Sequence, residues 1–469
     1  MPGQPYDLVI IGGGPGGYVG AIRAAQLGLR TALVEREKVG GTCLHIGCIP
    51  TKAMLHTAEV LEHLRGAADL GITLAGVPAV DLAAVHKRKA RVVETLYKGT
   101  QYLMRKNKID VFTGTGRFLS GRKIGVALAD GSETELEGSA VIIATGSAPR
   151  SVPGVTIDHK RVIDSTGALN LQTIPKSIAI LGAGPVGVEF ASIYRAFGSE
   201  VTLIELLPRL VPFEDEEVGT ALEKSFARRG IRSVTNATAK SATVSGDRVK
   251  ITVAKGDEAE TLEADYLLVA VGRAPVTQEL ILAEAGVQVA NGAVVVNEHL
   301  ETTVPGIYAI GDVITGQKPW RLAHVASDEA IAAVERIAGV ETHPLNYDAV
   351  PRPTFSIPQV ATVGLTERQA QEQGYDVKVG RCSFQPNSKA VIDGAREGFV
   401  KVVTEAKIGE ILGIHMIGPA VTELLAEGIA AKSLEATVTE VGAVVHSHPT
   451  LSEALREAAL DAMGRAIQF

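Results

Sequence analysis

The sequence predicts an α/β protein with two dinucleotide-binding domains followed by a C-terminal domain of a different kind. Three observations support this fold class: the chain is long, it is rich in glycine, and it contains one glycine-rich motif twice. At roughly 150 residues per domain, 469 residues suggest about three domains. The 50 glycines make up about 11% of the chain, above the usual proportion of about 7%. Tight nucleotide-binding turns would explain this excess.

The repeated motif consists of an apolar run, the pattern GxGxxG, a helix-compatible stretch and a second apolar run that ends in an acid. In both copies the acid lies 23 residues after the first glycine, so ordinary packing glycines explain the repeat poorly. One GxGxxG alone is a weak signal, but this order of elements is typical of the βαβ unit of a Rossmann-like domain. The motif residues are Gly12, Gly14, Gly17 and Glu35 in the first copy, and Gly182, Gly184, Gly187 and Glu205 in the second.

Each motif position has a physical role in binding a dinucleotide. The first glycine permits a tight turn, the second lets a pyrophosphate approach backbone N–H groups at a helix N-terminus, and the third lets helix and strand pack closely. The acid would accept hydrogen bonds from a ribose. Three further apolar runs end in glycine and read as buried strands that reach a ligand edge, namely 141–146, 267–272 and 307–311.

Proline and glycine clusters mark the domain boundaries, near residues 149–153, 272–275 and 342–353. We therefore expect a first dinucleotide domain at 1–150, a second at 151–274, a central domain at 275–345 and a final domain at 346–469. No nucleotide turn follows Pro353. The last ~115 residues should accordingly form a domain with another role.

The composition argues against several kinds of partner. Lys and Arg number 46 and Asp and Glu 53, so the net charge of −7 provides no basic field for nucleic acid. No apolar stretch approaches the roughly 20 residues that span a bilayer, and no basic segment precedes the first apolar run. The 3 cysteines are too few for a secreted disulfide framework. We expect a cytoplasmic protein that binds neither nucleic acid nor membrane.

Two cysteines, Cys43 and Cys48, follow the first motif closely, which places them near the first nucleotide. Residues five apart on a regular helix have Cα atoms roughly 8.6 Å apart, beyond disulfide reach. A bridge would therefore need a distorted turn, which Gly47 could supply, and its strain would make it easily reduced. Two alternatives stay open: inert buried thiols, and a zinc site made of Cys43, Cys48, His45 and His56.

The C-terminal domain carries a histidine, His448, five residues ahead of Glu453. A proline follows the histidine and fixes the local backbone, so the carboxylate could orient the imidazole and make it more basic. Taken alone, the segment reads as a surface turn. We expect the neighbouring His446 and the isolated Cys382 to be structural.

Together these motifs resemble those of the pyridine-nucleotide disulfide oxidoreductases over essentially the whole chain, most specifically in segments 41–52 and 448–453. Within that family the chain is most similar to enzymes that oxidise protein-bound dihydrolipoyl groups with NAD⁺. The resemblance implies FAD in the first unit and NAD in the second, and a C-terminal α+β domain that forms a dimer interface. Residues that it adds to the two sites are Thr145, Gly146, Gly272, Gly311 and Asp312.

The resemblance also implies a mechanism in which Cys43 and Cys48 form a redox disulfide and Cys43 is the interchange thiol. His448 of the other chain of a homodimer would act as the base. Lys52 and Glu189 would form a pair near the flavin. The alternative is that they are two unrelated surface charges. The implied partner is the lipoyl-bearing protein of a 2-oxo acid dehydrogenase or glycine-cleavage complex. A glutathione- or mercury-reducing relative, or a purely structural subunit, is the alternative.

Four positions depart from the family pattern. His45 and Val276 stand where Asn is common, and Val325 stands where Lys is frequent. Pro185 occupies the place where glutathione-reducing relatives have a Tyr over the flavin. None of the four is a redox residue, and Glu205 favours NAD over NADP because it would repel a 2′-phosphate.

Overall fold

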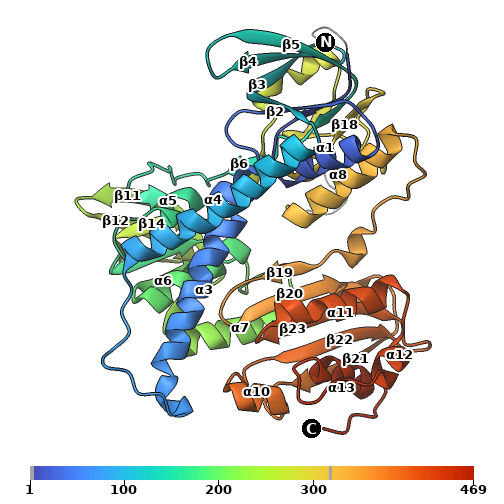
Figure 1. Cartoon of the computed structure of the whole chain (residues 1–469). Helices are drawn as coiled ribbons and strands as arrows, with labels where there is room; N and C mark the ends of the chain where they lie inside the picture. The colour runs from blue at the N-terminus through green and yellow to red at the C-terminus, as the bar shows by residue number, and fades with distance from the viewer. Residues whose placement is uncertain (1–4, 316–319, 469) are drawn as a thin grey trace. The chain divides into compact units, whose positions relative to one another are not determined.

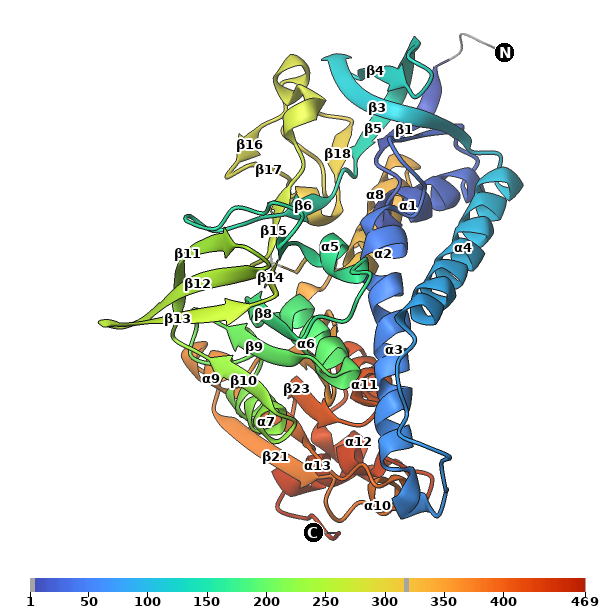
Figure 2. The ribbon, with the colours of Figure 1, turned by 90° about the vertical axis from the view of Figure 1, so that its left-hand side faces the viewer.

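The computed structural model describes residues 5–315 and 320–468, which form two compact units (Figures 1 and 2). Unit 1 comprises residues 1–53, 84–150 and 272–347, and unit 2 comprises residues 54–83, 151–271 and 348–469. Two long helices cross a unit boundary: α3 (Cys48–Arg65) and α4 (Leu82–Lys106). Each unit therefore combines segments that are distant in the sequence.

Unit 1 is built on a six-stranded sheet of order β1-β2-β3-β4-β5-β18, in which β1 also pairs with β5. The pairs β1–β2, β2–β3, β1–β5 and β5–β18 are parallel, whereas β4 pairs antiparallel with β3 and β5. Leu8, Val9 and Ile10 are consecutive and all fully buried, as expected for a parallel strand covered on both faces. The strands are β1 (Tyr6–Ile11), β2 (Thr31–Glu35), β3 (Asp110–Ser120), β4 (Lys123–Leu128), β5 (Glu133–Ile143) and β18 (Ile307–Ala309).

The helices of unit 1 include α1 (Pro15–Gln26), which packs against α8 (Ala323–Ile337), as Figure 1 shows. A short helix, α2 (Gly41–Ile46), follows β2. Strands β6 (Ser147–Pro149) and β15 (Arg273–Pro275) form a small antiparallel pair. It joins the end of segment 84–150 to the start of segment 272–347. Strand, glycine turn, helix and strand thus follow one another as the sequence predicts.

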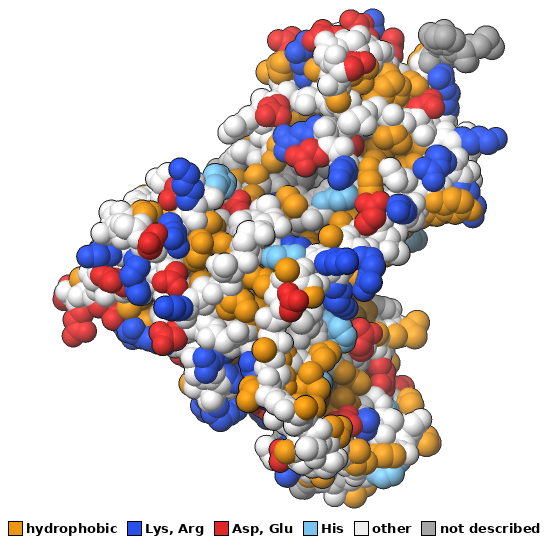
Figure 3. Space-filling model, turned by 60° about the vertical axis from the view of Figure 1, so that its left-hand side comes forward, with side chains coloured by type: hydrophobic (Ala, Val, Ile, Leu, Met, Phe, Trp, Pro, Cys, Tyr) orange, Lys and Arg blue, Asp and Glu red, His pale blue; other side chains and the backbone are white. Residues whose placement is uncertain are grey.

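Unit 2 contains the second parallel sheet, of order β10-β9-β8-β14-β7. Figure 2 shows the antiparallel strands β11 (Thr238–Ser245), β12 (Arg248–Lys255) and β13 (Glu258–Ala264) beside it. Acidic and basic side chains are interspersed over this region in Figure 3. One ion pair joins Lys250 of β12 to Glu263 of β13. The remaining elements are β7 (Val162–Ile163), α5 (Ser165–Leu169), β8 (Ser177–Leu181), α6 (Pro185–Phe197), β9 (Glu200–Ile204), α7 (Glu216–Arg228), β10 (Ile231–Val234) and β14 (Tyr266–Val269).

The C-terminal part of unit 2 is an antiparallel sheet of order β19-β20-β23-β22-β21. Its apolar side chains form a core with α11, α12 and α13, so this region is α+β, as expected. The elements are β19 (Arg352–Thr354), β20 (Gln359–Gly364), α9 (Glu367–Glu372), β21 (Val377–Ser383), α10 (Ser388–Asp393), β22 (Phe399–Glu405), β23 (Ile411–Gly418), α11 (Val421–Ser433), α12 (Val438–Ala443) and α13 (Glu453–Ala462).

A row of polar side chains crosses this sheet in register, with one residue from each of its five strands. The row, called the cross-strand row below, runs Arg352, Thr362, His415, Lys401 and Arg381. Because side chains alternate between the faces of a strand, these residues lie opposite the apolar core.

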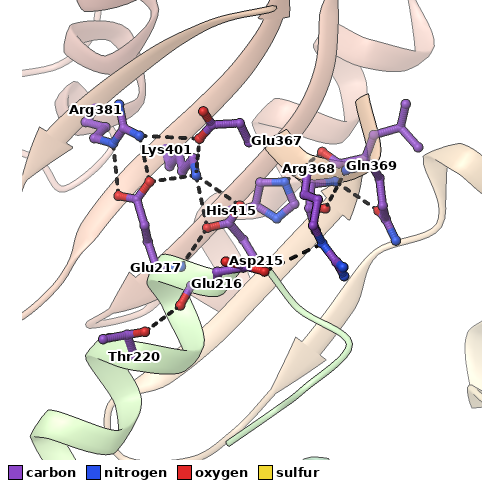
Figure 4. Close-up of polar contacts among 12 residues, drawn as sticks. Asp215, Glu216, Glu217, Thr220, Glu367, Arg368, Gln369, Arg381, Lys401 and His415 are labelled. Carbon is purple, nitrogen blue, oxygen red and sulfur yellow. Dashed lines mark hydrogen bonds and ion pairs between the residues drawn. The ribbon is translucent and has the colours of Figure 1, made fainter. Parts of the chain in front are cut away.

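The acidic residues at the start of α7 meet the cross-strand row (Figure 4). Lys401 contacts Asp215 at 3.0 Å and Glu217 at 2.7 Å, and Glu367 of α9 at 2.8 Å. Arg352 pairs with Glu214 at 3.2 Å. These buried ion pairs join the second nucleotide-binding region to the C-terminal sheet within unit 2.

Within residues 5–315 and 320–468, no helix is both long enough and apolar enough to cross a bilayer.

Candidate active site

The first glycine turn has the geometry that a bound dinucleotide requires. Gly12 has φ +108°, and a Cβ on it would lie 2.2 Å from the carbonyl oxygen of Ala144. A Cβ on Gly17 would lie 1.8 Å from the carbonyl oxygen of Gly12, so α1 and β1 pack too closely for any side chain. Gly14, the N-cap of α1, has no neighbour within 4 Å of such a Cβ. This open space at a helix N-terminus fits the pyrophosphate of FAD.

The second glycine turn repeats these contacts. Gly182 has φ +101°, and its Cβ would lie 2.5 Å from the carbonyl oxygen of Ala270. A Cβ on Gly187 would lie 1.9 Å from the carbonyl oxygen of Gly182, while Gly184 again faces open space. The second turn therefore fits a second dinucleotide in the same way.

The two motif acids are held identically. Glu35 accepts a hydrogen bond from the N–H of Gly13 at 2.6 Å, and Glu205 accepts one from the N–H of Ala183 at 2.7 Å. A carboxylate has about four acceptor positions, so each acid can still bind a ribose hydroxyl. Arg209, the cation closest to Glu205 in sequence, pairs with Glu216 at 3.1 Å. It is thus already committed to a carboxylate and poorly placed to neutralise a 2′-phosphate.

The segments that the sequence analysis assigned to the FAD site are linked to one another in unit 1. The hydroxyl of Thr145 donates to the carbonyl of Val276 at 2.6 Å, and the N–H of Val276 donates to the carbonyl of Gly146 at 3.0 Å. Gly272, which was predicted as a cofactor-site residue but not assigned to FAD, accepts the N–H of Arg150 with its carbonyl at 3.2 Å. Because Val276 acts through its backbone, its departure from the family Asn leaves this link intact.

Asp312 is fixed by two residues, neither of which was predicted from the sequence. The hydroxyl of Ser147 donates to its carboxylate at 2.5 Å, and the Nε atom of Arg273 lies 3.9 Å away. Ser147 has no motif of its own, so only its contact with Asp312 reveals it. The sequence analysis also missed Glu329, whose signal was a charge on the apolar face of α8, one turn after the buried Val325.

The cysteine segment begins directly on the first glycine turn. The N–H of Gly40 donates to the carbonyl of Gly13 at 2.7 Å, and a Cβ on Gly41 would lie 2.7 Å from the Cα of Gly14. Helix α2 ends at Ile46 and α3 begins at Cys48, so the helix breaks at Gly47, where the sequence predicts a distortion. Both thiols are thereby held near the predicted FAD site.

The thiols of Cys43 and Cys48 interact directly. A hydrogen bond between them is the largest cause that raises the pKa of Cys43, followed by burial. The ammonium of Lys52, one turn after Cys48 on α3, opposes this shift. The contact with Cys48 and burial therefore hold the proton on Cys43.

The two histidines of the alternative zinc site, His45 and His56, have other contacts. The Nε2 atom of His45 contacts the carbonyl of Val39 at 3.0 Å, and its ring packs edge-on against Tyr97. His56 lies 3.6 Å from Glu59. In the part of the chain that the structure describes, no group of three or more His, Cys, Asp or Glu side chains could hold a metal ion.

The C-terminal histidine and its acid are in contact. The Nδ1 atom of His448 lies 2.9 Å from Glu453, whose other oxygen accepts the N–H of Thr450 at 2.8 Å. Burial alone would raise the pKa of Glu453, but these bonds lower it overall, so the acid stays ionised. The imidazole side chain is 64% exposed, which leaves its Nε2 accessible. In contrast, His446 is buried against Glu427 at 2.7 Å, as expected for a structural residue.

Three other residues from the sequence analysis have clear environments. Glu189 is buried on α6 and accepts the N–H of Phe355 at 3.0 Å. It belongs to unit 2 whereas Lys52 belongs to unit 1, so their pairing stays a prediction. Pro185 is exposed in the first turn of α6. Cys382 is buried, and burial raises its pKa to about 12, as expected for a silent thiol.

Comparison with known families covers nearly the whole chain. The family described as pyridine nucleotide-disulphide oxidoreductase matches residues 6–330. The dimerisation domain of the same family matches residues 350–459.

Several curated relatives are similar over essentially their full length. The chain is 45% identical to dihydrolipoyl dehydrogenase 3 of Pseudomonas putida, covering 99% of this chain and 100% of that protein. It is 46% identical to dihydrolipoyl dehydrogenase of Bacillus subtilis, covering 99% of each. Among solved structures, LpdA of Mycobacterium tuberculosis matches with a TM-score of 0.89 and 28% identity, over 96% of this chain and 98% of that one.

Proposed function

Because the chain belongs to the pyridine nucleotide-disulphide oxidoreductase family, we propose that it is a dihydrolipoyl dehydrogenase. It oxidises protein-bound dihydrolipoyl groups to lipoyl groups and reduces NAD⁺ to NADH, with FAD as its bound cofactor. The observation that carries this function is the cysteine pair, whose segment starts on the first glycine turn through Gly40 and Gly41. The full-length similarity to dihydrolipoyl dehydrogenases favours this substrate over glutathione or mercuric ion.

The protein residues carry out the thiol chemistry. His448, oriented by Glu453, takes the proton of one dihydrolipoyl thiol. The resulting thiolate attacks Cys43, which breaks the Cys43–Cys48 disulfide and leaves Cys48 as the thiolate. The second lipoyl sulfur then attacks the mixed disulfide, so that lipoyl is released oxidised and both cysteines are reduced. Two electrons and two protons have then left the substrate.

The cofactors of the two dinucleotide sites would receive these electrons. FAD, when bound, supplies electron-pair transfer from the cysteine pair to NAD⁺. The first glycine turn and Glu35 hold FAD, and the second glycine turn and Glu205 hold NAD⁺. The side chain of Lys52, one turn after Cys48, acts to lower the pKa of Cys43 and so opposes the effect of burial. Glu189 is its proposed partner near the flavin.

The active enzyme is a homodimer in which each site uses His448 of the other chain. Two observations support this assembly: the family dimerisation domain covers residues 350–459, and the imidazole of His448 is largely exposed in the single chain. Val445, three residues earlier, is 94% exposed, which suits a residue that a second chain covers. The electron donor is the lipoyl-bearing protein of a 2-oxo acid dehydrogenase or glycine-cleavage complex, and the enzyme acts in the cytoplasm.

Two assays in parallel test the substrate. We expect rapid NAD⁺ reduction with dihydrolipoamide and little NADPH oxidation by oxidised glutathione. Cys43→Ser should abolish the first reaction, whereas the matched control Cys382→Ala, at a buried thiol outside the site, should retain it. Faster turnover with glutathione than with dihydrolipoamide would refute the proposal.

Mixed dimers test the shared site. Inactive Cys43→Ser and His448→Gln chains that are refolded together pair at random, so half of the dimers are mixed. Each mixed dimer has one site with both defects and one with neither. About a quarter of native activity should return. If mixed dimers form but no activity returns, the histidine acts within its own chain.

A further inference from the structure

We propose that Glu329 is a positioning residue for the FAD site: from helix α8 it holds the Gly311–Asp312 turn in place. Tyr347 in turn holds the Glu329 carboxylate. The inference rests on the proposed function in one respect, since it takes Gly311 and Asp312 as part of the FAD site. Nothing in the motifs of the sequence points to Glu329 or Tyr347.

Both oxygens of the Glu329 carboxylate are in use. The N–H of Gly311 donates to Oε2 at 2.6 Å, and the hydroxyl of Tyr347 donates to Oε1 at 2.8 Å. The residue is 2% exposed. The turn also approaches α8 closely, because a Cβ on Gly311 would lie only 3.1 Å from the Cβ of Ala326.

The carboxylate is costly at this position, which argues that its acceptor role matters. Burial, helped by the charges of Asp312 and Asp328, raises the pKa of Glu329 to about 7, although the bonds from Gly311 and Tyr347 act to lower it. An apolar side chain on α8 would avoid the cost of burying a charge. It would, however, remove the acceptor of the Gly311 N–H.

Glu329 completes a chain of contacts around the turn. Gly311 is tied to α8 through Glu329, and the next residue, Asp312, is tied to Ser147 at 2.5 Å. Ser147 belongs to the segment that follows Thr145 and Gly146 of the predicted FAD site. The turn is therefore fixed from both sides, and loss of Glu329 would free the α8 side alone.

The release of FAD from the holoprotein measures this role directly. The holoprotein is diluted and the fluorescence of freed flavin gives the FAD dissociation constant. Glu329→Leu removes a charged acceptor from a backbone N–H, and we expect binding to weaken ~10-fold or more. Glu329→Gln should stay within about threefold, because its amide oxygen still accepts from Gly311 and its amide nitrogen can donate to the Tyr347 oxygen. Tyr347→Phe should give an intermediate loss.

A matched control lies on the same helix. Glu335 of α8 also forms an ion pair, with Arg23 of α1 at 2.5 Å, but it does not contact the turn. Glu335→Leu should leave the FAD dissociation constant within about twofold of the native value. An equal effect of Glu335→Leu and Glu329→Leu would mean that α8 matters only as a packed helix, and would overturn the proposal.

The pH profile provides a readout that packing alone would not move. Protonation turns the charged acceptor into a neutral, weaker one. The ratio of the dissociation constants of Glu329→Gln and native protein should therefore fall from pH 8 to pH 6. A constant ratio, or native FAD affinity in both Glu329→Leu and Tyr347→Phe, would refute the positioning role. A protein that binds FAD but does not oxidise dihydrolipoamide would refute the proposed function and leave this inference standing.

Discussion

Replacing Lys401 by Met tests how strongly the cross-strand row and the start of α7 hold unit 2 together. The ammonium of Lys401 contacts three carboxylates, and its side chain is 2% exposed. Methionine has a similar length but no charge. The change therefore removes the cation and leaves the packing of the sheet nearly intact.

The size of the effect depends on which acid is left unpaired. Glu217 keeps Arg381 at 2.6 Å, and Glu367 keeps the same arginine at 3.5 Å. Among the described residues, Asp215 keeps only the N–H of Glu217 as a hydrogen-bond donor, at 3.0 Å, and its side chain is 2% exposed. Removal of one partner from a buried ion pair typically costs about 3–5 kcal/mol. We expect Lys401→Met to lose that amount of unfolding free energy at neutral pH.

Urea unfolding of the holoprotein in excess FAD, monitored by circular dichroism, measures the unfolding free energy of each variant. The variants are compared with one shared dependence of that free energy on urea concentration. Lys401→Met combined with Asp215→Asn removes the orphaned charge while the Asn still caps α7. The double variant should recover about 2 kcal/mol or more relative to Lys401→Met. Arg381→Met is the matched control in the same cluster, and because its side chain is 44% exposed, it should cost no more than about 1 kcal/mol.

Two results would contradict this reasoning. If the unfolding free energy of Lys401→Met stays within about 1 kcal/mol of the native value, the buried ion pair contributes no net stability. The carboxylate of Asp215 is then hydrated in the variant. If the double variant is as unstable as Lys401→Met, the loss comes from packing around the methionine and not from an unpaired carboxylate.

Dihydrolipoamide added in the absence of oxygen should produce a long-wavelength absorbance from the Cys48 thiolate beside oxidised flavin. Cys48→Ser should abolish this absorbance while flavin stays bound. An absorbance that persists in this variant would show that Cys48 is not its source. Glu205→Gln should narrow the preference in kcat/KM for NAD⁺ over NADP⁺, because the repulsion of the 2′-phosphate is lost; an unchanged preference would contradict the assignment. The pKa of Glu217 is lowered to about 2, chiefly by Arg381, so its stabilisation is complete above its ordinary pKa near 4.5 and is lost as pH falls toward 2. The stability difference between native protein and Glu217→Gln should shrink over that range in acid unfolding, and a difference independent of pH would argue against the ion pair.

The local parts of the protein can be predicted from its amino-acid sequence. Both glycine turns, their acids and the break at Gly47 lie within segments of about 25 residues, where backbone sterics and strand-helix periodicity fix the geometry. The contact of His448 with Glu453 is local for the same reason. The redox role of Cys43 and Cys48 could be predicted only through the resemblance of segment 41–52 to the family, because their spacing alone left inert thiols and a zinc site open.

The distant side chains that support these local sites depend on how separate elements pack. Lys401 and Asp215 are 186 residues apart, and their contact depends on a strand register that aligns five polar residues on one face. Arg209 follows Glu205 closely in the chain, yet its charge is taken by Glu216. Glu329 reaches Gly311 because α8 packs beside the turn. Sequence periodicity shows that such residues interrupt an apolar face, but their partners depend on how separate elements pack, which no local pattern encodes.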